Sequence, residues 1–161
     1  MIDLTHVHPM IVHFPIALLI VGFLTDLASL FIKQEFFKQT GFYLLILGAL
    51  GTVAALLSGE QAGSGLAGQG VLGQAIEQHE EAAELALWLV LITALFRIAL
   101  VLLKKYTGVF KIVALVLFFL SVGAIARTGY YGGKLVYEHA AGVEFNLGLD
   151  LSSSMEQDTD D

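Results

Sequence analysis

Five histidines, all near one end of the apolar segments of this chain, are the residues whose type and placement could do chemistry. They are His6, His8, His13, His79 and His139. Imidazole nitrogens suit haem iron, Cu(II), Zn(II) and non-haem iron. The chain has no cysteine and only three methionines, which disfavours soft-metal sites and excludes covalent haem attachment.

Apolar helices must position these histidines. Of the 161 residues, 57% are hydrophobic and 14% are charged, whereas soluble domains are about 45–50% apolar. Spanning a bilayer takes about 20 helical residues, and four runs reach or approach that length. The runs are Val12–Ile32, Phe42–Ser58, Ala82–Leu103 and Val109–Ala126, the last with a helix expected to continue to residue 131. We predict an all-α integral membrane four-helix bundle over residues 1–143 and a disordered acidic tail over 144–161.

Lysines in the short loops predict the orientation of the bundle, because loops rich in Lys and Arg stay in the cytoplasm. They are Lys33, Lys38, Lys104, Lys105 and Lys111. Both termini should then lie on the periplasmic side of a bacterial inner membrane. The first span should be retained, because its leader lacks the basic residues of a signal peptide. A net charge of −7 argues against nucleic-acid binding.

The histidines fall at one depth. At about 1.5 Å per helical residue, His8 and His79 lie roughly 20 Å above the bilayer centre and His13 roughly 14 Å. A layer of residues from separate helices is what a metal or haem site in a bundle requires. His8 and His13 are five residues apart and would point about 140° away from each other on a straight helix. They would therefore serve two centres, unless the prolines near them turn the chain. His6 is interpreted as an ordinary interfacial residue.

Several ligands fit this layer. A b-type haem needs an imidazole on each side and cations for its propionates, and Arg127 and Lys134 lie at the right end. Zn or Cu, with added carboxylates, is equally compatible; the candidates are Glu80, Glu81 and Glu138. A structural polar network, or proton or substrate handling, are the other interpretations.

Other polar and small residues predict packing. Gly48/Thr52 and Gly51/Ala55 place small residues four apart, which lets membrane helices approach closely. Gly132 and Gly133 either break the last helix or admit another element, and a short continuation would carry Glu138 and His139 before Gly142 ends it. From about Val71 the pattern is helical, so the third helix should begin above the membrane.

Two charges fall inside the predicted spans. Asp26 and Arg97 both lie roughly 6–7 Å below the bilayer centre. Charges at that depth usually face the bundle interior and pair. We predict a contact between Asp26 and Arg97 on adjacent helices, direct or through one water, that fixes helix register.

The two ends of the chain carry the motifs "HPMIVHFPIALL" and "GGKLVYEHAAGV". They resemble the signatures H-P-x-x-V-H-F-P-I-A-L and G-G-x-L-V-Y-x-H-G-x-G-V of a widespread bacterial family of uncharacterised four-helix membrane proteins. The resemblance covers about residues 8–143. It matches the family histidines to His8, His13, His79 and His139. Further matches are Pro9, Phe14, Pro15, Asp26, Gly132, Gly133, Tyr137, Gly142 and Val143, whereas Ala140 stands where the family usually has Gly.

The resemblance implies a redox role, because relatives occur joined to c-type cytochrome or Rieske iron–sulfur modules, and the family is similar to membrane dihaem cytochromes b. We therefore expect one or two b-type haems, with the four family histidines as axial ligands. The haems would pass electrons between a periplasmic c-type cytochrome or iron–sulfur partner and a quinol or partner subunit. The bundle could also form homo-oligomers. The alternatives are a non-redox Zn or Cu protein, for binding or transport, and a structural accessory subunit.

Overall fold

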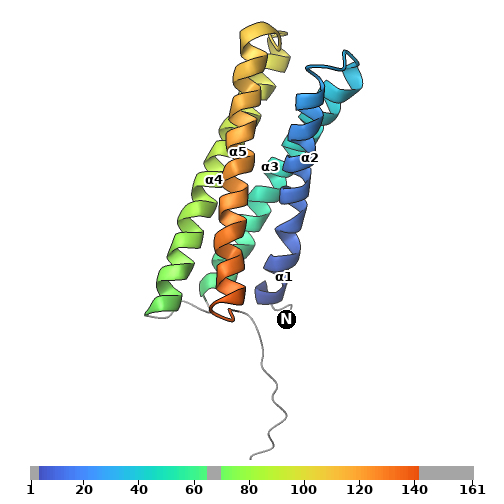
Figure 1. The fold of residues 1–161 in the computed structure, drawn as a ribbon. Coiled ribbons are helices and arrows are strands. Elements are labelled where there is room, and N and C mark those ends of the chain that lie inside the picture. The colour runs from blue at the N-terminus through green and yellow to red at the C-terminus, as the bar shows by residue number, and fades with distance from the viewer. Residues whose placement is uncertain (1–3, 65–69, 142–161) are drawn as a thin grey trace, which may run out of the picture.

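The computed structural model describes residues 4–64 and 70–141, and the side chains of residues 7–63 and 70–141. In this part of the chain every regular element is a helix, and the helices lie side by side along one axis (Figure 1). They are α1 (Leu4–Ile11), α2 (His13–Ala28), α3 (Glu35–Ser64), α4 (Val71–Leu102) and α5 (Gly108–Tyr137). The prediction of an all-α bundle is confirmed. The predicted tail, Gly142 and the side chain of His6 lie outside the described part.

Four helical segments are long and apolar enough to cross a membrane. They are Val7–Ala28, Glu35–Gly63, Val71–Leu102 and Gly108–Tyr137. Their outer faces expose large apolar side chains, such as Leu95 at 65% and Phe119 at 60%. So much apolar surface is stable when lipid covers it. The chain is a multi-pass membrane protein.

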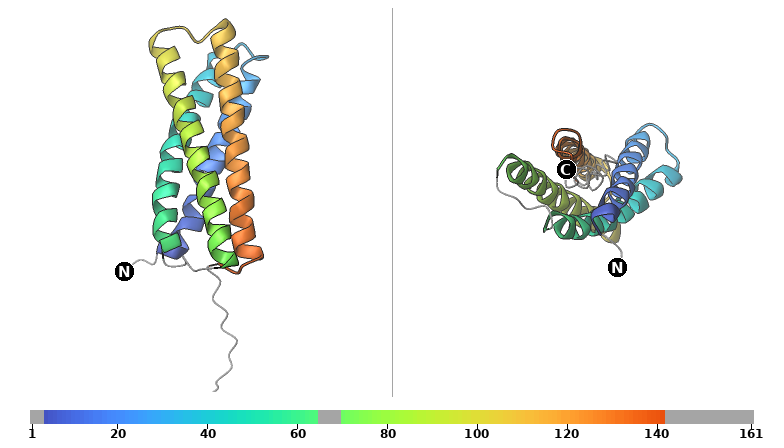
Figure 2. Two further views of the ribbon diagram at one scale, coloured as in Figure 1. Left: turned by 90° about the vertical axis from the view of Figure 1, so that its left-hand side faces the viewer. Right: turned by 90° about the horizontal axis from the view of Figure 1, so that it is seen from below.

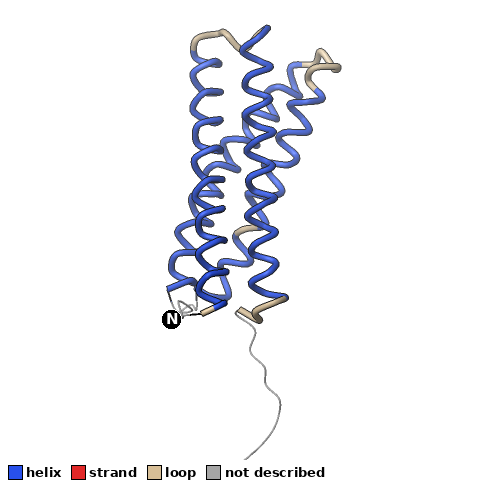
Figure 3. Tube along the Cα trace, turned by 60° about the vertical axis from the view of Figure 1, so that its left-hand side comes forward, coloured by secondary structure: helices blue, strands red, loops and turns tan. Residues whose placement is uncertain are grey.

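The two ends of the bundle differ in chemistry. At one end, which we call the histidine end, α1 and α4 begin and α3 and α5 finish (Figure 1). At the other, the basic end, residues 29–34 and 103–107 form short connections (Figure 3). These connections carry Lys33, Lys104 and Lys105.

The helices extend beyond the predicted spans mainly at the histidine end. Helix α3, which contains the second predicted span, reaches Ser64 rather than Ser58, and α5 reaches Tyr137. Helix α4, which contains the third predicted span, begins at Val71, where the sequence pattern turns helical. The added turns of α3 and α4 contain Ala, Gln and Glu, which favour helix without being apolar. An apolar run therefore measures the hydrocarbon thickness rather than the helix length.

Two hairpins build the bundle. The first joins α1 and α2 to α3, and the second joins α4 to α5 (Figure 2). The hairpins meet where α3 packs on α4 and α2 packs on α5. Their shared core includes Leu19, Leu45, Val90 and Phe118, each at most 2% exposed.

The first hairpin depends on a close approach of α2 and α3. A Cβ atom on Gly48 would lie 2.7 Å from the Cγ and Cδ2 atoms of Leu19, and one on Gly51 would lie 3.3 Å from Pro15. These glycines form the packing face that their spacing predicts. Leu19 is fully buried there.

The first membrane span is interrupted at Val12. Pro15 has no amide hydrogen to donate to the Ile11 carbonyl, and its ring crowds that carbonyl. Val12 nevertheless keeps helical angles, with φ −61° and ψ −26°. The break therefore separates α1 from α2 with little change of direction, and places His8 and His13 on different helices.

The end of α5 departs from the predicted continuation. The helix passes through Gly132 and Gly133 without a break and finishes at Tyr137. Glu138 caps it, with its amide donating to the Lys134 carbonyl at 2.9 Å. His139 follows, and Ala140 adopts a left-handed φ of 49°. That conformation is the one that glycine favours.

Gly48→Ala should lower the free energy of unfolding by about 1–3 kcal/mol, the usual cost of overpacking a filled core. Gly123→Ala is the matched control, because a Cβ there meets nothing within 4 Å. Thermal unfolding in detergent measures both variants. Equal melting temperatures for the two would contradict the close approach of α2 and α3.

Candidate functional site

Two imidazoles from opposite hairpins meet at the histidine end. His8 lies on α1 and His79 on α4, and both side chains are partly buried. Their ring centroids are 6.4 Å apart, with 78° between the ring planes. We call these two residues the histidine pair.

Hydrogen bonds fix the tautomer of His8. Its Nδ1 lies 2.9 Å from the hydroxyl oxygen of Ser58 on α3. That hydroxyl donates its hydrogen to the Ala55 carbonyl, also at 2.9 Å. Because a hydroxyl has one hydrogen to give, the Nδ1 of His8 must be the donor. The lone pair of His8 is then on Nε2.

The same assignment holds for His79. Its Nδ1 lies 3.2 Å from the Thr128 carbonyl oxygen on α5, which can only accept. The Nε2 atom therefore carries the lone pair. The single hydroxyl hydrogen of Thr128 is shared between the carbonyls of Ala82 and Ala124, whose oxygens lie 2.9 and 3.0 Å away. These contacts fix the part of α5 that bonds to His79. Metal-binding histidines are usually oriented in this way through their second nitrogen.

Glycines leave room for both rings. A Cβ on Gly59 would lie 2.9 Å from the Cε1 atom of His8, and one on Gly132 would lie 3.3 Å from that of His79. Each imidazole therefore rests against a helix backbone. Of the two roles predicted for Gly132, close approach by another element is the one observed.

The structure brings together two of the four family histidines. His13 is exposed, and its Nδ1 bonds to the Pro9 carbonyl on the preceding turn. His139 lies beyond the end of α5 and is partly buried. No hydrogen bond or ring contact joins either one to the histidine pair within the described residues. Nor does this part of the chain hold a group of three or more His, Asp or Glu side chains that could bind a metal ion.

The two cations predicted for propionates lie on the last turns of α5. The guanidinium carbon of Arg127 is 5.4 Å from the ring centroid of Tyr131. The Nζ atom of Lys134 is 5.9 Å from the ring of Tyr130 and 3.5 Å from a carboxylate oxygen of Glu138. Both cations are thus at the histidine end, on the helix that holds His79 through Thr128.

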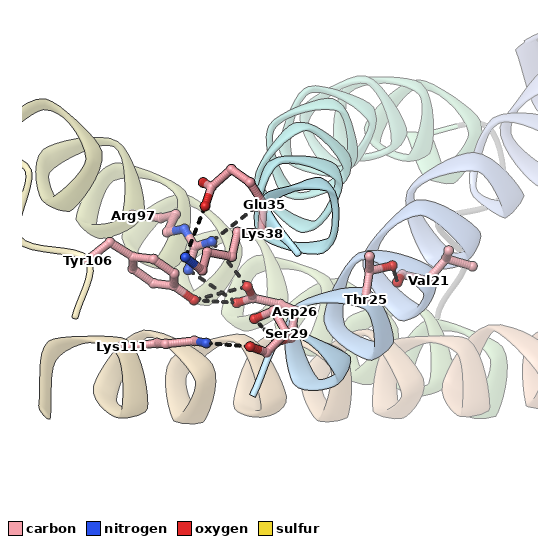
Figure 4. A network of polar contacts seen from close by, with 9 residues as sticks. All are labelled: Val21, Thr25, Asp26, Ser29, Glu35, Lys38, Arg97, Tyr106 and Lys111. Atoms are coloured by element: carbon pink, nitrogen blue, oxygen red, sulfur yellow. Dashed lines mark hydrogen bonds and ion pairs between the residues drawn. The ribbon is translucent and has the colours of Figure 1, made fainter. Parts of the chain in front are cut away.

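A second polar cluster occupies the basic end (Figure 4). The Nη1 and Nη2 atoms of Arg97 donate to the two carboxylate oxygens of Asp26, at 3.2 and 3.1 Å. Both side chains are 3% exposed. The predicted contact is therefore present and direct, but the prediction of adjacent helices is wrong. Helix α2 packs on α3 and α5 rather than on α4, and the long arginine side chain crosses the bundle.

Tyr106 completes this cluster, and sequence reasoning missed it. Its hydroxyl lies 2.9 Å from each carboxylate oxygen of Asp26, and its ring stacks on Arg97, 3.1 Å from the guanidinium carbon. Nearby, the Lys111 ammonium donates to the Ser29 carbonyl at 2.9 Å. The sequence feature that indicated a role for Tyr106 was its position in a short loop between two spans flanked by lysines. Ser58 and Thr128, which hydrogen-bond to the histidine pair, were also missed.

Comparison with known proteins gives one match. A family profile described as "Predicted membrane protein (DUF2231)" matches residues 5–144. No curated protein and no solved structure matches the chain. The matched region includes the histidine pair and the Asp26–Arg97 contact.

Replacing Asp26 by Leu or Arg97 by Met should each lower the free energy of unfolding by about 3–5 kcal/mol, because each change strands a buried charge. The double variant should recover part of that loss. Glu35→Gln, which breaks the exposed pair with Lys38, is the control and should cost about 0–1 kcal/mol. Denaturation in detergent would measure all four, and single variants as stable as the parent would refute the ion pair.

Proposed function

The chain belongs to the DUF2231 family of predicted membrane proteins, and on that premise we propose that it binds one b-type haem between His8 and His79 and transfers electrons. The observation that carries this proposal is the histidine pair. Each imidazole donates from Nδ1 to a neighbouring helix and keeps its Nε2 lone pair for a ligand.

The number of ligands favours haem over zinc. Protein zinc sites use at least three protein ligands, and the described residues bring two imidazoles together without a third donor. Two imidazoles suffice for haem, because the porphyrin supplies the other four nitrogens. His8 and His79, with ring centroids 6.4 Å apart, would hold the iron of this haem.

The surrounding residues suit the task of axial ligands. Ser58 and the Thr128 carbonyl hold the ring orientations and increase the electron density on each Nε2. Gly59 and Gly132 keep the helix backbones against the rings. Arg127 and Lys134, at the same end of the bundle, would pair with the propionates. Haem supplies the one-electron couple when bound, and the chain sets its position and potential.

The lysines of the short loops indicate how the bundle would be oriented in the membrane. Because basic loops stay in the cytoplasm, the basic end would face the cytoplasm of a bacterial cell and the histidine end would face the periplasm. A haem held by His8 and His79 would then exchange electrons with a periplasmic c-type cytochrome or iron–sulfur protein, or with a quinol. No described contact supports a second haem at His13 or His139.

The purified protein should show a Soret band that shifts on addition of dithionite. With two histidine ligands the iron should give a low-spin spectrum. His79→Ala should lose that spectrum, because the iron loses an axial ligand, whereas His13→Ala should keep it at full intensity. Visible spectroscopy with haem quantification measures both. A colourless parent would refute the proposal. Equal loss in the two variants would show that His79 has no special role.

Ser58→Ala should weaken haem binding about tenfold, the usual effect of removing a hydrogen-bond partner of a histidine ligand. Thr52→Ala is the matched control, because among the described residues the buried Thr52 hydroxyl bonds only to the Gly48 carbonyl of its own helix. Transfer of haem to apomyoglobin gives the affinity. Identical affinities in the two variants would remove Ser58 from the site.

A further inference from the structure

A groove opens at the basic end, between the beginning of α3 and the end of α4. Its volume is about 370 Å³, and both cations and apolar side chains line it. It is remote from the histidine pair, at the other end of the bundle (Figure 1). The proposed haem does not use it.

The polar residues that line the groove are mainly basic. They include Lys38, Lys104 and Arg97, against one carboxylate, Glu35. Glu35 pairs with Lys38 at 3.0 Å. The ammonium of Lys104 makes no ion pair within the described part of the chain. The groove therefore keeps an uncompensated positive charge at its rim.

The backbone at Lys104 closes the end of α4. Lys104 follows the C-cap residue Leu103 and has a left-handed φ of 55°. Its amide donates to the Val101 carbonyl at 3.1 Å, and the next amide, of Lys105, donates to the Leu100 carbonyl at 2.8 Å, which is the hydrogen-bond pattern of a Schellman cap. The cap fixes the backbone of Lys104 beside the groove.

Arg97 contributes a guanidinium group to the same lining. Its two Nη atoms bind Asp26, and Nη2 also donates to the Lys38 carbonyl at 3.3 Å. This bond joins the backbone of α3 at Lys38 to α4 beside the groove.

Apolar side chains from both helices also line the groove. They include Phe42, Tyr43, Leu100 and Val101. Tyr43 is 61% exposed and Val101 is 43% exposed, on helices that cross the membrane. A ligand of this groove would meet cations at its head and lipid-facing side chains along its tail.

We propose that this groove binds the headgroup of an anionic phospholipid from the leaflet that borders the basic end. The phosphate would lie between Lys104 and Lys38, and an acyl chain would run along Tyr43 and Val101. Basic pockets between membrane helices on the cytoplasmic side bind anionic headgroups in this way. The groove thereby ties the first hairpin to the second through a lipid.

The proposal is tested by adding phosphatidylglycerol to the delipidated protein in detergent and measuring its binding by native mass spectrometry. Lys104→Gln should bind about fivefold more weakly, the effect of one basic residue near an anionic lipid surface. Lys105→Gln, in the same loop but outside the groove, is the matched control and should bind like the parent. Glu35→Gln should bind more tightly, a change of sign that partial unfolding would not produce.

Phosphatidylcholine and inorganic phosphate are the comparison ligands. Phosphatidylcholine should bind more weakly than phosphatidylglycerol, and inorganic phosphate should not compete at equal concentration. Equal binding by the two lipids, competition by inorganic phosphate, or equal weakening in Lys104→Gln and Lys105→Gln would overturn the proposal. The haem spectrum of Lys104→Gln should match that of the parent, so failure of this site is distinguishable from failure of the haem site.

Discussion

The buried ion pair between Asp26 and Arg97 is the contact on which the arrangement of the two hairpins depends. Each charge belongs to a different hairpin, and neither can be exposed to hydrocarbon without a large cost. The bidentate geometry, with Tyr106 on the same carboxylate, fixes both the height and the rotation of α2 relative to α4. Sliding one hairpin along the other would break it.

This register has a consequence at the far end of the bundle. His8 precedes Asp26 by 18 residues, and His79 precedes Arg97 by 18 residues as well. The two segments run in the same direction from the histidine end to the basic end, so equal offsets of about 27 Å place both imidazoles at one height. The glycine contacts between α2 and α3 and the buried Thr93–Ser121 hydroxyl contact at 2.9 Å hold the helices between these two levels. The ion pair thus positions the histidine pair without touching it.

Much of this could be predicted from the sequence, and the rest depends on side-chain direction. Depth depends only on residue count, so the four membrane-crossing helices, the common level of His8 and His79 and the Asp26–Arg97 contact followed from position along apolar helices. Which histidines meet depends on helix rotation and packing. His13, five residues from His8, is on the exposed side, which agrees with the large angle expected between them. The sequence shows that Tyr106 lies between two lysine-flanked spans, but its contact with Asp26 depends on the conformation of the connection after α4.

Electron paramagnetic resonance of the oxidised, haem-loaded protein tests the central claim most directly, because the spin state of the iron reports its axial ligands. If His8 and His79 both bind one iron, the spectrum is that of low-spin ferric haem with two imidazoles, and either histidine changed to alanine converts it to high spin. A high-spin signal from the parent protein would contradict the account.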